Sequence, residues 1–210
     1  MQSLHLRIGR VAEADELVRR HHYSKRPPAN VQIVATLHDA GGLFGDYGDA
    51  VAACYLCIPP TRWSETVLEL ARLVRIDRRI VLTPLIAAAC DAAKRQGHDL
   101  LVSFADRTQG HHGGIYQAAS WAYAGCRACR MDGVILDGVF LPGRSCNSRW
   151  GTRIPRKLSE ILGREVQPHF DEGKHLYWRA LGPRGTAKAK RLGLQSLPYP
   201  KPAKQEDAAA

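Results

Sequence analysis

The residue types best suited to chemistry gather within residues 100–121. An apolar run, too short for a helix, ends in the polar residues Ser103 and Asp106, and a glycine-containing loop then leads to His111 and Tyr116. A carboxylate can accept a proton, a hydroxyl can orient a neighbour, and a tyrosine or imidazole can donate a proton. We interpret the run as a buried strand with polar groups at its carboxyl end, where open α/β sheets place their sites. The alternative is an ordinary strand–turn–helix connection.

The hydrophobic periodicity predicts the elements that must position these residues. Alternating or continuous apolar runs predict strands, and a 3.6-residue period predicts helices. In chain order we expect a strand at 4–8, a helix at 11–20, strands at 30–38, 50–58 and 66–76, a helix at 85–96, a strand at 100–106 and a helix ending at 121.

The second half of the chain predicts further strands. We expect residues 122–129 and 134–141 to pair as a hairpin across Met131-Asp132-Gly133, followed by a basic loop over 144–156, a short helix at 155–162 and an edge strand at 175–180. Strands outnumber helices and several are joined by short turns. The predicted fold is therefore α/β (α+β), with a mixed, mostly antiparallel sheet flanked by helices. We expect one domain over residues 1–181 and a disordered basic tail over 182–210.

The net charge predicts a polyanionic partner. The 210 residues include 30 basic and 20 acidic side chains, a formal charge of +10. Nucleic acid is the commonest partner of such a protein, although a basic surface can also serve solubility alone. Candidate contacts inside the fold are Lys25, Arg26, Arg144, Arg149, Trp150, Arg153, Arg156 and Lys157. Arginine suits phosphate, and Trp150 could act as an aromatic wedge or could pack beneath the surface.

The six cysteines and the first residues bear on compartment and metal binding. No signal peptide or membrane span is evident, so we expect a cytoplasmic protein with reduced thiols. The pairs Cys54/Cys57 and Cys126/Cys129 have zinc-ribbon spacing but lie in apolar, strand-like runs. Alternation along a strand would point the members of a pair to opposite faces, so we favour buried thiols over zinc.

Several short motifs together resemble the Mom family of phage DNA-modification proteins. They are His22-Tyr23-Ser24, Glu69-Leu-Ala-Arg-Leu-Val-Arg75, Ser103-Phe-Ala-Asp106, Gly110-His111-x-Gly113-x-x-Tyr116 and Arg149-Trp-Gly151. The resemblance spans residues 21–151 and rests on the order and spacing of the motifs. It implies a fold similar to the Gcn5-related N-acetyltransferases. It also implies conversion of adenine in double-stranded DNA to an N6-carbamoylmethyl form, which protects phage DNA from restriction in the host cytoplasm.

The resemblance also implies the site residues. His22, Tyr23, Ser103, Asp106 and Tyr116 match motif positions implicated in this activity. Adenine N6 is a poor nucleophile, so the base must leave the duplex, lose a proton and meet a stabilised donor. We expect Asp106 to accept the proton, Ser103 to hydrogen-bond, Tyr116 to protonate the leaving group and Tyr23 to stack on the base. For both tyrosines the alternative is core packing.

The donor and the metal are left open by the sequence. Acetyltransferases of this superfamily hold coenzyme A with a glycine-rich turn, whereas residues 75–84 contain no glycine. Arg78, Arg79 and Thr83 are the candidates for holding donor phosphates. The donor could be acetyl-CoA or a charged tRNA. The resemblance also implies iron, for which His22 and His111 are the candidate ligands, although His22 could instead be a helix-terminal cation.

Two other functions fit the sequence. One is a non-enzymatic nucleic-acid-binding module with zinc on the cysteine pairs. The other is an acetyltransferase acting on amines of proteins or small molecules.

Overall fold

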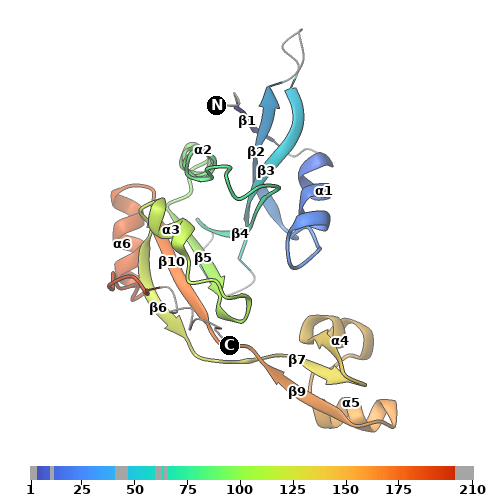
Figure 1. Cartoon of the computed structure of the whole chain (residues 1–210). Coiled ribbons are helices and arrows are strands. Elements are labelled where there is room, and N and C mark those ends of the chain that lie inside the picture. Colours follow the sequence, from blue (N-terminus) through green and yellow to red (C-terminus); the bar gives the residue numbers. More distant parts are fainter. Residues whose placement is uncertain (1–3, 10–11, 41–46, 60–62, 64–65, 202–210) are drawn as a thin grey trace, which may run out of the picture. The chain divides into compact units, whose positions relative to one another are not determined.

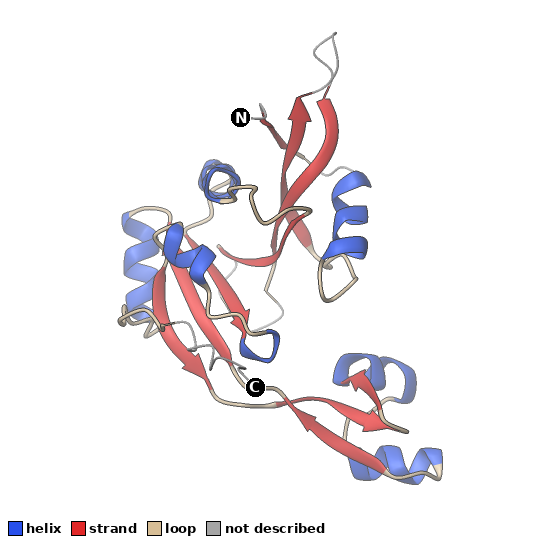
Figure 2. Ribbon diagram, viewed as in Figure 1, coloured by secondary structure: helices blue, strands red, loops and turns tan. Residues whose placement is uncertain are grey.

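The chain divides into two compact units, where the sequence predicted one domain up to residue 181. A computed structural model describes residues 4–9, 12–40, 47–59, 63 and 66–201. The first unit comprises Met1–Phe104, Gly113–Gly125 and Leu176–Ala210, and the second comprises Ala105–His112 and Cys126–His175. Figure 1 shows the elements of both units along the chain, and Figure 2 separates helices from strands.

The first unit is built on a large mixed sheet. Its strands are β1 (Leu4–Ile8), β2 (Val31–Ala40), β3 (Tyr47–Cys57), β4 (Val67–Arg75), β5 (Leu100–Asp106), β6 (Ala122–Arg127) and β10 (Lys174–Ala180). Among the described residues they lie in the order β1-β2-β3-β4-β5-β10-β6. The pairs from β1 to β4 are antiparallel, whereas β4 and β5 are parallel. The predicted fold class is confirmed.

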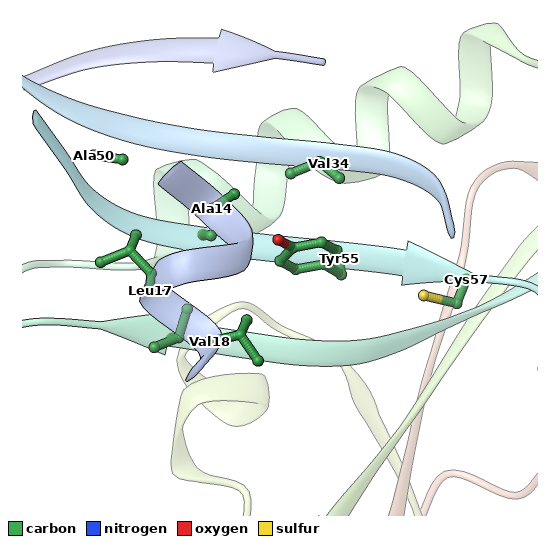
Figure 3. Close-up of a cluster of buried hydrophobic side chains, with 9 residues drawn as sticks. Ala14, Leu17, Val18, Val34, Ala50, Tyr55 and Cys57 are labelled. Carbon is green, nitrogen blue, oxygen red and sulfur yellow. The ribbon is translucent and has the colours of Figure 1, made fainter. Parts of the chain in front are cut away.

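Helices α1 (Ala12–His21) and α2 (Thr83–Arg95) cover this sheet. Acidic residues open α1 and basic residues close it, which suits the helix dipole. Its apolar side packs Ala14, Leu17 and Val18 onto alternate residues of β3, including Tyr55 and Cys57 (Figure 3). The Tyr55 hydroxyl donates to Asp15 Oδ1 at 2.7 Å and satisfies the one polar atom that this ring buries. The predicted helix began at Val11, which lies outside the described residues.

The C-terminal part of the first unit is folded, so the prediction of a disordered tail is wrong for residues 183–201. Helix α6 (Pro183–Arg191) buries Gly185, Lys188 and Ala189. Lys188 Nζ lies 2.8 Å from Asp99 Oδ2, which also accepts from Thr66 Oγ1 at 2.7 Å. A basic, alanine-rich sequence does not prevent folding when one lysine has a buried carboxylate to pair with. Residues 202–210 lie outside the described residues.

Strand β10 is also placed differently from the prediction. It was expected at an edge but lies between β5 and β6. Strand β6 therefore pairs in this sheet and does not form the predicted hairpin with residues 134–141. That hairpin prediction is wrong.

The second unit contains a smaller sheet and two helices. Strand β7 (Met131–Leu136) pairs antiparallel with β8 (Val139–Pro142) and with β9 (Val166–Phe170). The turn between β7 and β8 is Asp137-Gly138, where both residues have positive φ (51° and 76°), as a type I′ turn requires. A 3-10 turn (Arg107–Gln109), α4 (Gly143–Trp150) and α5 (Pro155–Leu162) complete the unit.

Two sequence predictions change here. The expected basic loop over 144–156 contains helix α4, which ends at Gly151 in the left-handed conformation. Cys129 lies beyond the end of β6, so the predicted alternation of Cys126 and Cys129 along one strand is wrong. Helix α5 has the predicted bounds.

In the described part of the chain, every helix is too short or too polar to cross a bilayer.

Candidate functional site

The candidate site lies where the parallel pairing of β4 and β5 ends. Register pairs run from Val67–Leu100 to Leu70–Ser103 and go no further, although both strands continue. Ser103 is fully buried, and its Oγ donates to the Leu70 carbonyl oxygen at 2.8 Å. Ser103 therefore lies at the point where β5 leaves β4.

Tyr116 reaches Ser103 from the short helix α3 (Gly114–Ala118). Gly113 precedes this helix with φ +83°, and a Cβ there would overlap the Tyr177 ring. Only glycine can therefore bring the chain this close to Tyr177. The Tyr116 ring lies 5.2 Å from that of Tyr177 and 5.5 Å from that of Trp121, centroid to centroid. This aromatic packing fixes the direction of the Tyr116 hydroxyl.

The surroundings of Tyr116 keep its hydroxyl protonated. Burial raises the pKa of Tyr116 well above its usual value, and a hydrogen bond with Ser103 opposes part of that increase. Electrostatic interactions with three more groups add to the increase: Cys54, Tyr23 and Glu69. At neutral pH the Tyr116 hydroxyl is thus protonated, and the catalytic role expected of it stays a prediction.

Tyr23 and His22 follow helix α1 and belong to the same unit. Tyr23 is 49% exposed, so core packing does not account for it. Its ring centroid lies 4.3 Å from that of His22. His22 Nδ1 lies 2.9 Å from Ser24 Oγ and accepts the backbone N–H of Ser24 at 3.1 Å. Tyr116 thus has a hydrogen bond with Ser103 and an electrostatic interaction with Tyr23, and the Tyr23 ring lies beside that of His22.

Glu69 is a site residue that our list of candidates missed. It lies in β4, with Cys57 opposite in β3 and Val102 opposite in β5, so its backbone is in the interior of the sheet. Its charge raises the pKa of Tyr116, and it contributes, after burial, to a pKa of about 12 for Cys57. Glu69 is the one acidic residue of β4, and this was the signal that could have identified it.

Asp106 and His111 belong to the second unit. Asp106 Oδ1 accepts the backbone N–H of Thr108 at 3.1 Å and caps the 3-10 turn. Its other carboxylate oxygen lies 3.2 Å from Lys174 Nζ. The backbone N–H of His111 donates to the backbone carbonyl oxygen of Asp106 at 3.1 Å. These contacts give Asp106 and His111 a structural role in this turn. That either side chain also lies near Tyr23 stays a prediction.

The described residues give the predicted iron site no support. Nowhere in the described ranges do three or more His, Cys, Asp or Glu side chains group so as to share one metal ion. His22 and His111 lie in different units. Cys54 and Cys57 are buried in β3, whereas Cys126 and Cys129 are exposed, so zinc gains no support from the pairs either.

The connection from β4 to α2 holds the predicted donor-binding residues. Asp77 orders it by accepting from Arg79 Nη2 at 2.5 Å and from the Arg79 N–H at 2.8 Å. Arg78 is exposed, and Thr83 begins α2 without a side-chain cap on that helix. The Arg79 guanidinium is therefore already paired with the Asp77 carboxylate, which lowers the positive charge that it can offer to a phosphate.

The candidate DNA contacts are divided between the units. In the first, Lys25 donates to the Arg20 carbonyl oxygen at 2.5 Å, and the Arg26 carbonyl oxygen accepts from Arg72 at 3.3 Å. The others lie on α4, on α5 and between them, and five of these side chains are exposed: Arg144, Arg149, Arg153, Arg156 and Lys157. Trp150 is half-buried against the core cluster of the second unit, which favours packing over insertion.

Comparison with known proteins identifies the family and the fold. None of the curated proteins matches the chain. An N-acetyltransferase from Staphylococcus aureus has a similar structure, with a TM-score of 0.51 at 10% identity over 86% of this chain and 99% of that one. An acetyltransferase from Salmonella typhimurium, solved with its cofactor acetyl-CoA, has a TM-score of 0.50 at 9% identity over 86% and 95%. The fold is that of the Gcn5-related N-acetyltransferases. The sequence profile of the Mom protein family matches residues 3–201, so the chain belongs to this family.

Proposed function

We propose that this protein is a DNA-modifying transferase that converts adenine to its N6-carbamoylmethyl form and so protects phage DNA from restriction. The observation that carries the proposal is the hydrogen-bonded pair of Tyr116 and Ser103 at the end of the β4–β5 pairing. Membership of the Mom family supplies the substrate class. The acetyltransferase fold supports transfer of a small carbon group to an amine.

The residues at this site support proton transfer in both directions. The N6 lone pair is delocalised into the purine ring, so the amine must lose a proton as its new bond to carbon forms. Glu69 can accept that proton, with Asp106 as the alternative that the motif suggests. Tyr116, kept protonated by burial, can give a proton to the leaving group. Exposed Tyr23 offers a ring on which the displaced adenine can stack.

The donor must supply more than an acetyl group. A carbamoylmethyl group contains a nitrogen that acetyl lacks, whereas a glycyl group has the same atoms in a different order. An aminoacyl donor on a coenzyme A thioester or on a charged tRNA therefore supplies the right atoms. Attack of N6 on its carbonyl carbon releases the thiol or the tRNA hydroxyl and gives an N6-glycyl amide, so a further rearrangement must replace this N6–carbonyl bond by a bond from N6 to the methylene carbon. The fold favours the thioester. We propose that Arg78, Arg79 and Thr83 meet its phosphates, and the exposure of both arginines supports this. The positive charge of the two arginines would then hold the phosphates that a glycine-rich turn holds in the acetyltransferases.

Nucleoside analysis tests the function directly. DNA from host cells expressing the protein is digested and analysed by mass spectrometry, beside DNA from cells expressing Tyr116→Phe. We expect a modified deoxyadenosine with the mass of a carbamoylmethyl adduct, strongly reduced in the variant. Unmodified DNA together with newly acetylated protein amines would instead favour an amine acetyltransferase.

A second pair of variants separates the two proton acceptors. Glu69→Gln and Asp106→Asn each remove one negative charge with little change in volume. If Glu69 is the base, Glu69→Gln abolishes the modification and Asp106→Asn only lowers it. The reverse result would assign the proton to Asp106.

A further inference from the structure

A pocket of about 460 Å³ lies within the second unit, beside the β7–β8 turn and helices α4 and α5. Its size is in the range of sites for small molecules. Aliphatic side chains such as Val139 and Leu141 line it together with one aromatic ring, Trp150. The polar groups are two guanidinium groups, from Arg149 and Arg164, and one carboxylate, from Asp137. A planar, partly apolar ligand with negative charge attached fits this combination.

Trp150 and Arg149 form a stacked pair at this pocket. The Arg149 Cζ lies 4.8 Å from the centre of the Trp150 ring, within cation–π distance. The indole is held from below by the buried cluster of Val134, Cys146 and Leu158. Arg149 itself is exposed. Trp150 is therefore a fixed support for the flat, positively charged guanidinium group of Arg149. A base can stack on this guanidinium group.

The second arginine is oriented at the rim of the same pocket. Arg164 Nη1 lies 2.7 Å from Asp137 Oδ2, and both side chains are more than half exposed. Such a surface ion pair adds little to folding stability. A contribution to stability therefore does not explain why Arg164 and Asp137 are paired here. Asp137 itself lies in the β7–β8 turn with φ +51°.

The charge around the pocket indicates the class of ligand. Residues 143–157, which we name the α4–α5 segment, contain five basic side chains and no acidic one. Four of its basic side chains lie outside the pocket, and all are exposed. An isolated small anion would need only the pocket, whereas a chain of phosphates could use the whole segment.

We propose that this pocket binds one unstacked base of a DNA strand, with the base against the Arg149–Trp150 pair and its flanking phosphates on Arg149 and Arg164. The proposal rests on DNA as the partner in the proposed function, which it deepens by assigning a base-binding site to the second unit. Removing a base from its stack costs free energy, and a pocket that receives one lowers that cost.

The test compares strands with and without bases. The full-length protein is titrated with a fluorescent single strand of twelve thymidines and with the same strand made of abasic sugars. Base stacking contributes about 1–3 kcal/mol per base, or about 5- to 150-fold in affinity, so we expect at least a fivefold preference for the strand with bases.

Two variants of α4 separate the pocket from general electrostatics. Arg149→Ala and Arg144→Ala each remove one positive charge from the same helix, but only Arg149 lines the pocket. Arg144→Ala should weaken both strands equally and keep the preference. Arg149→Ala should reduce the preference itself, and Trp150→Phe should reduce it in part.

Three results would overturn the proposal. They are no preference for bases in the wild-type protein, an equal preference in the two arginine variants, or much tighter binding of the matching RNA strand. Tyr116→Phe should keep the preference. A preserved preference without any modified adenine would leave the pocket standing and reject only the proposed chemistry.

Discussion

At the scale of single residues, the hydroxyl of Tyr116 is the atom on which the proposed chemistry depends. Tyr116→Phe keeps the ring against Trp121 and Tyr177 and removes only that hydroxyl. General-acid catalysis contributes about 10²- to 10⁴-fold, so we expect the adenine modification to fall by at least about 100-fold. One lost hydrogen bond should change stability by only about 1 kcal/mol.

Tyr177→Phe is the matched control for this prediction. Tyr177 is a buried tyrosine of the same aromatic group, and its hydroxyl accepts from Gln117 at 3.0 Å. Activity should therefore survive in this variant. Equal losses in both variants, measured by nucleoside analysis and thermal unfolding, would mean that packing and not proton donation explains the effect.

The buried carboxylate of Asp99 predicts a pH dependence of stability. A hydrogen bond from Lys188, followed by one from Thr66, lowers the pKa of Asp99 below its usual value. A carboxyl group whose pKa is lower in the folded state stabilises fully above its unfolded-state pKa, about 3.9, and loses this contribution as pH falls through the folded value. The benefit should thus be complete at pH 6–7 and decline below about pH 4.

Asp99→Asn isolates this contribution. The substitution leaves Lys188 buried without its charged partner, so at pH 7 we expect a loss of about 3 kcal/mol or more in the free energy of unfolding. Urea denaturation at pH 7, 5 and 3 should show the difference from wild type shrinking only at the lowest pH. A difference independent of pH would contradict the assignment.

The site could be predicted from the sequence only in part, and the reason differs between residues. The positions of Ser103 in a strand and Tyr116 in a helix were predictable because a short apolar run followed by glycines specifies a strand, a turn and a helix in order. Glu69 was missed because a charged residue in a strand usually faces solvent, and its central position depends on strand order. Strand order joins segments far apart in the chain, which no local pattern reveals.

At the scale of elements, the turn of the second unit shows how a local signal can be misplaced. The chain has two Asp-Gly pairs, Asp132-Gly133 and Asp137-Gly138, and either could form a two-residue hairpin turn. The second pair makes the turn. Gly133 lies inside β7, where a Cβ would overlap the Leu141 carbonyl oxygen on β8, so glycine is needed there for close strand contact. The same dipeptide thus serves two purposes, and tertiary contacts decide between them.

Helix α6 gives a prediction at the same scale, because it docks through a glycine. A Cβ at Gly185 would overlap the backbone oxygen of Asp99, which cannot move aside as a flexible side chain could. Gly185→Ala should therefore push α6 away from the sheet and destabilise the protein by about 1–3 kcal/mol. Proteolysis should then begin within residues 183–201.

Gly193→Ala is the comparison for Gly185→Ala. Gly193 follows α6 with φ +67°, and a Cβ there would meet open space, so only backbone strain remains. We expect a loss of about 1 kcal/mol and no new proteolytic site. Equal behaviour of the two variants in urea denaturation would show that α6 does not need the close approach at Gly185.

At the scale of the whole molecule, the question is which part of its +10 charge meets DNA. The folded α6 ends in the exposed residues Lys190 and Arg191, and the α4–α5 segment carries exposed Arg144 and Arg153. Both places offer basic groups, and net charge alone cannot distinguish them. The two differ in how their basic groups are presented, because all five basic side chains of the α4–α5 segment are exposed whereas Lys188 of α6 is buried against Asp99. We expect the α4–α5 segment to hold the phosphates.

The salt dependence of duplex binding decides between them. Each lost phosphate contact lowers the slope of log affinity against log salt concentration by about 0.9, so Arg144→Ala with Arg153→Ala should flatten it by about 1.8. The loss of affinity should be similar for all sequences, since phosphate contacts carry no base information. Lys190→Ala with Arg191→Ala removes the same charge and should leave the slope nearly unchanged. Titrations at two salt concentrations measure both, and a flatter slope only in the α6 variant would move the DNA contact from the second unit to the first.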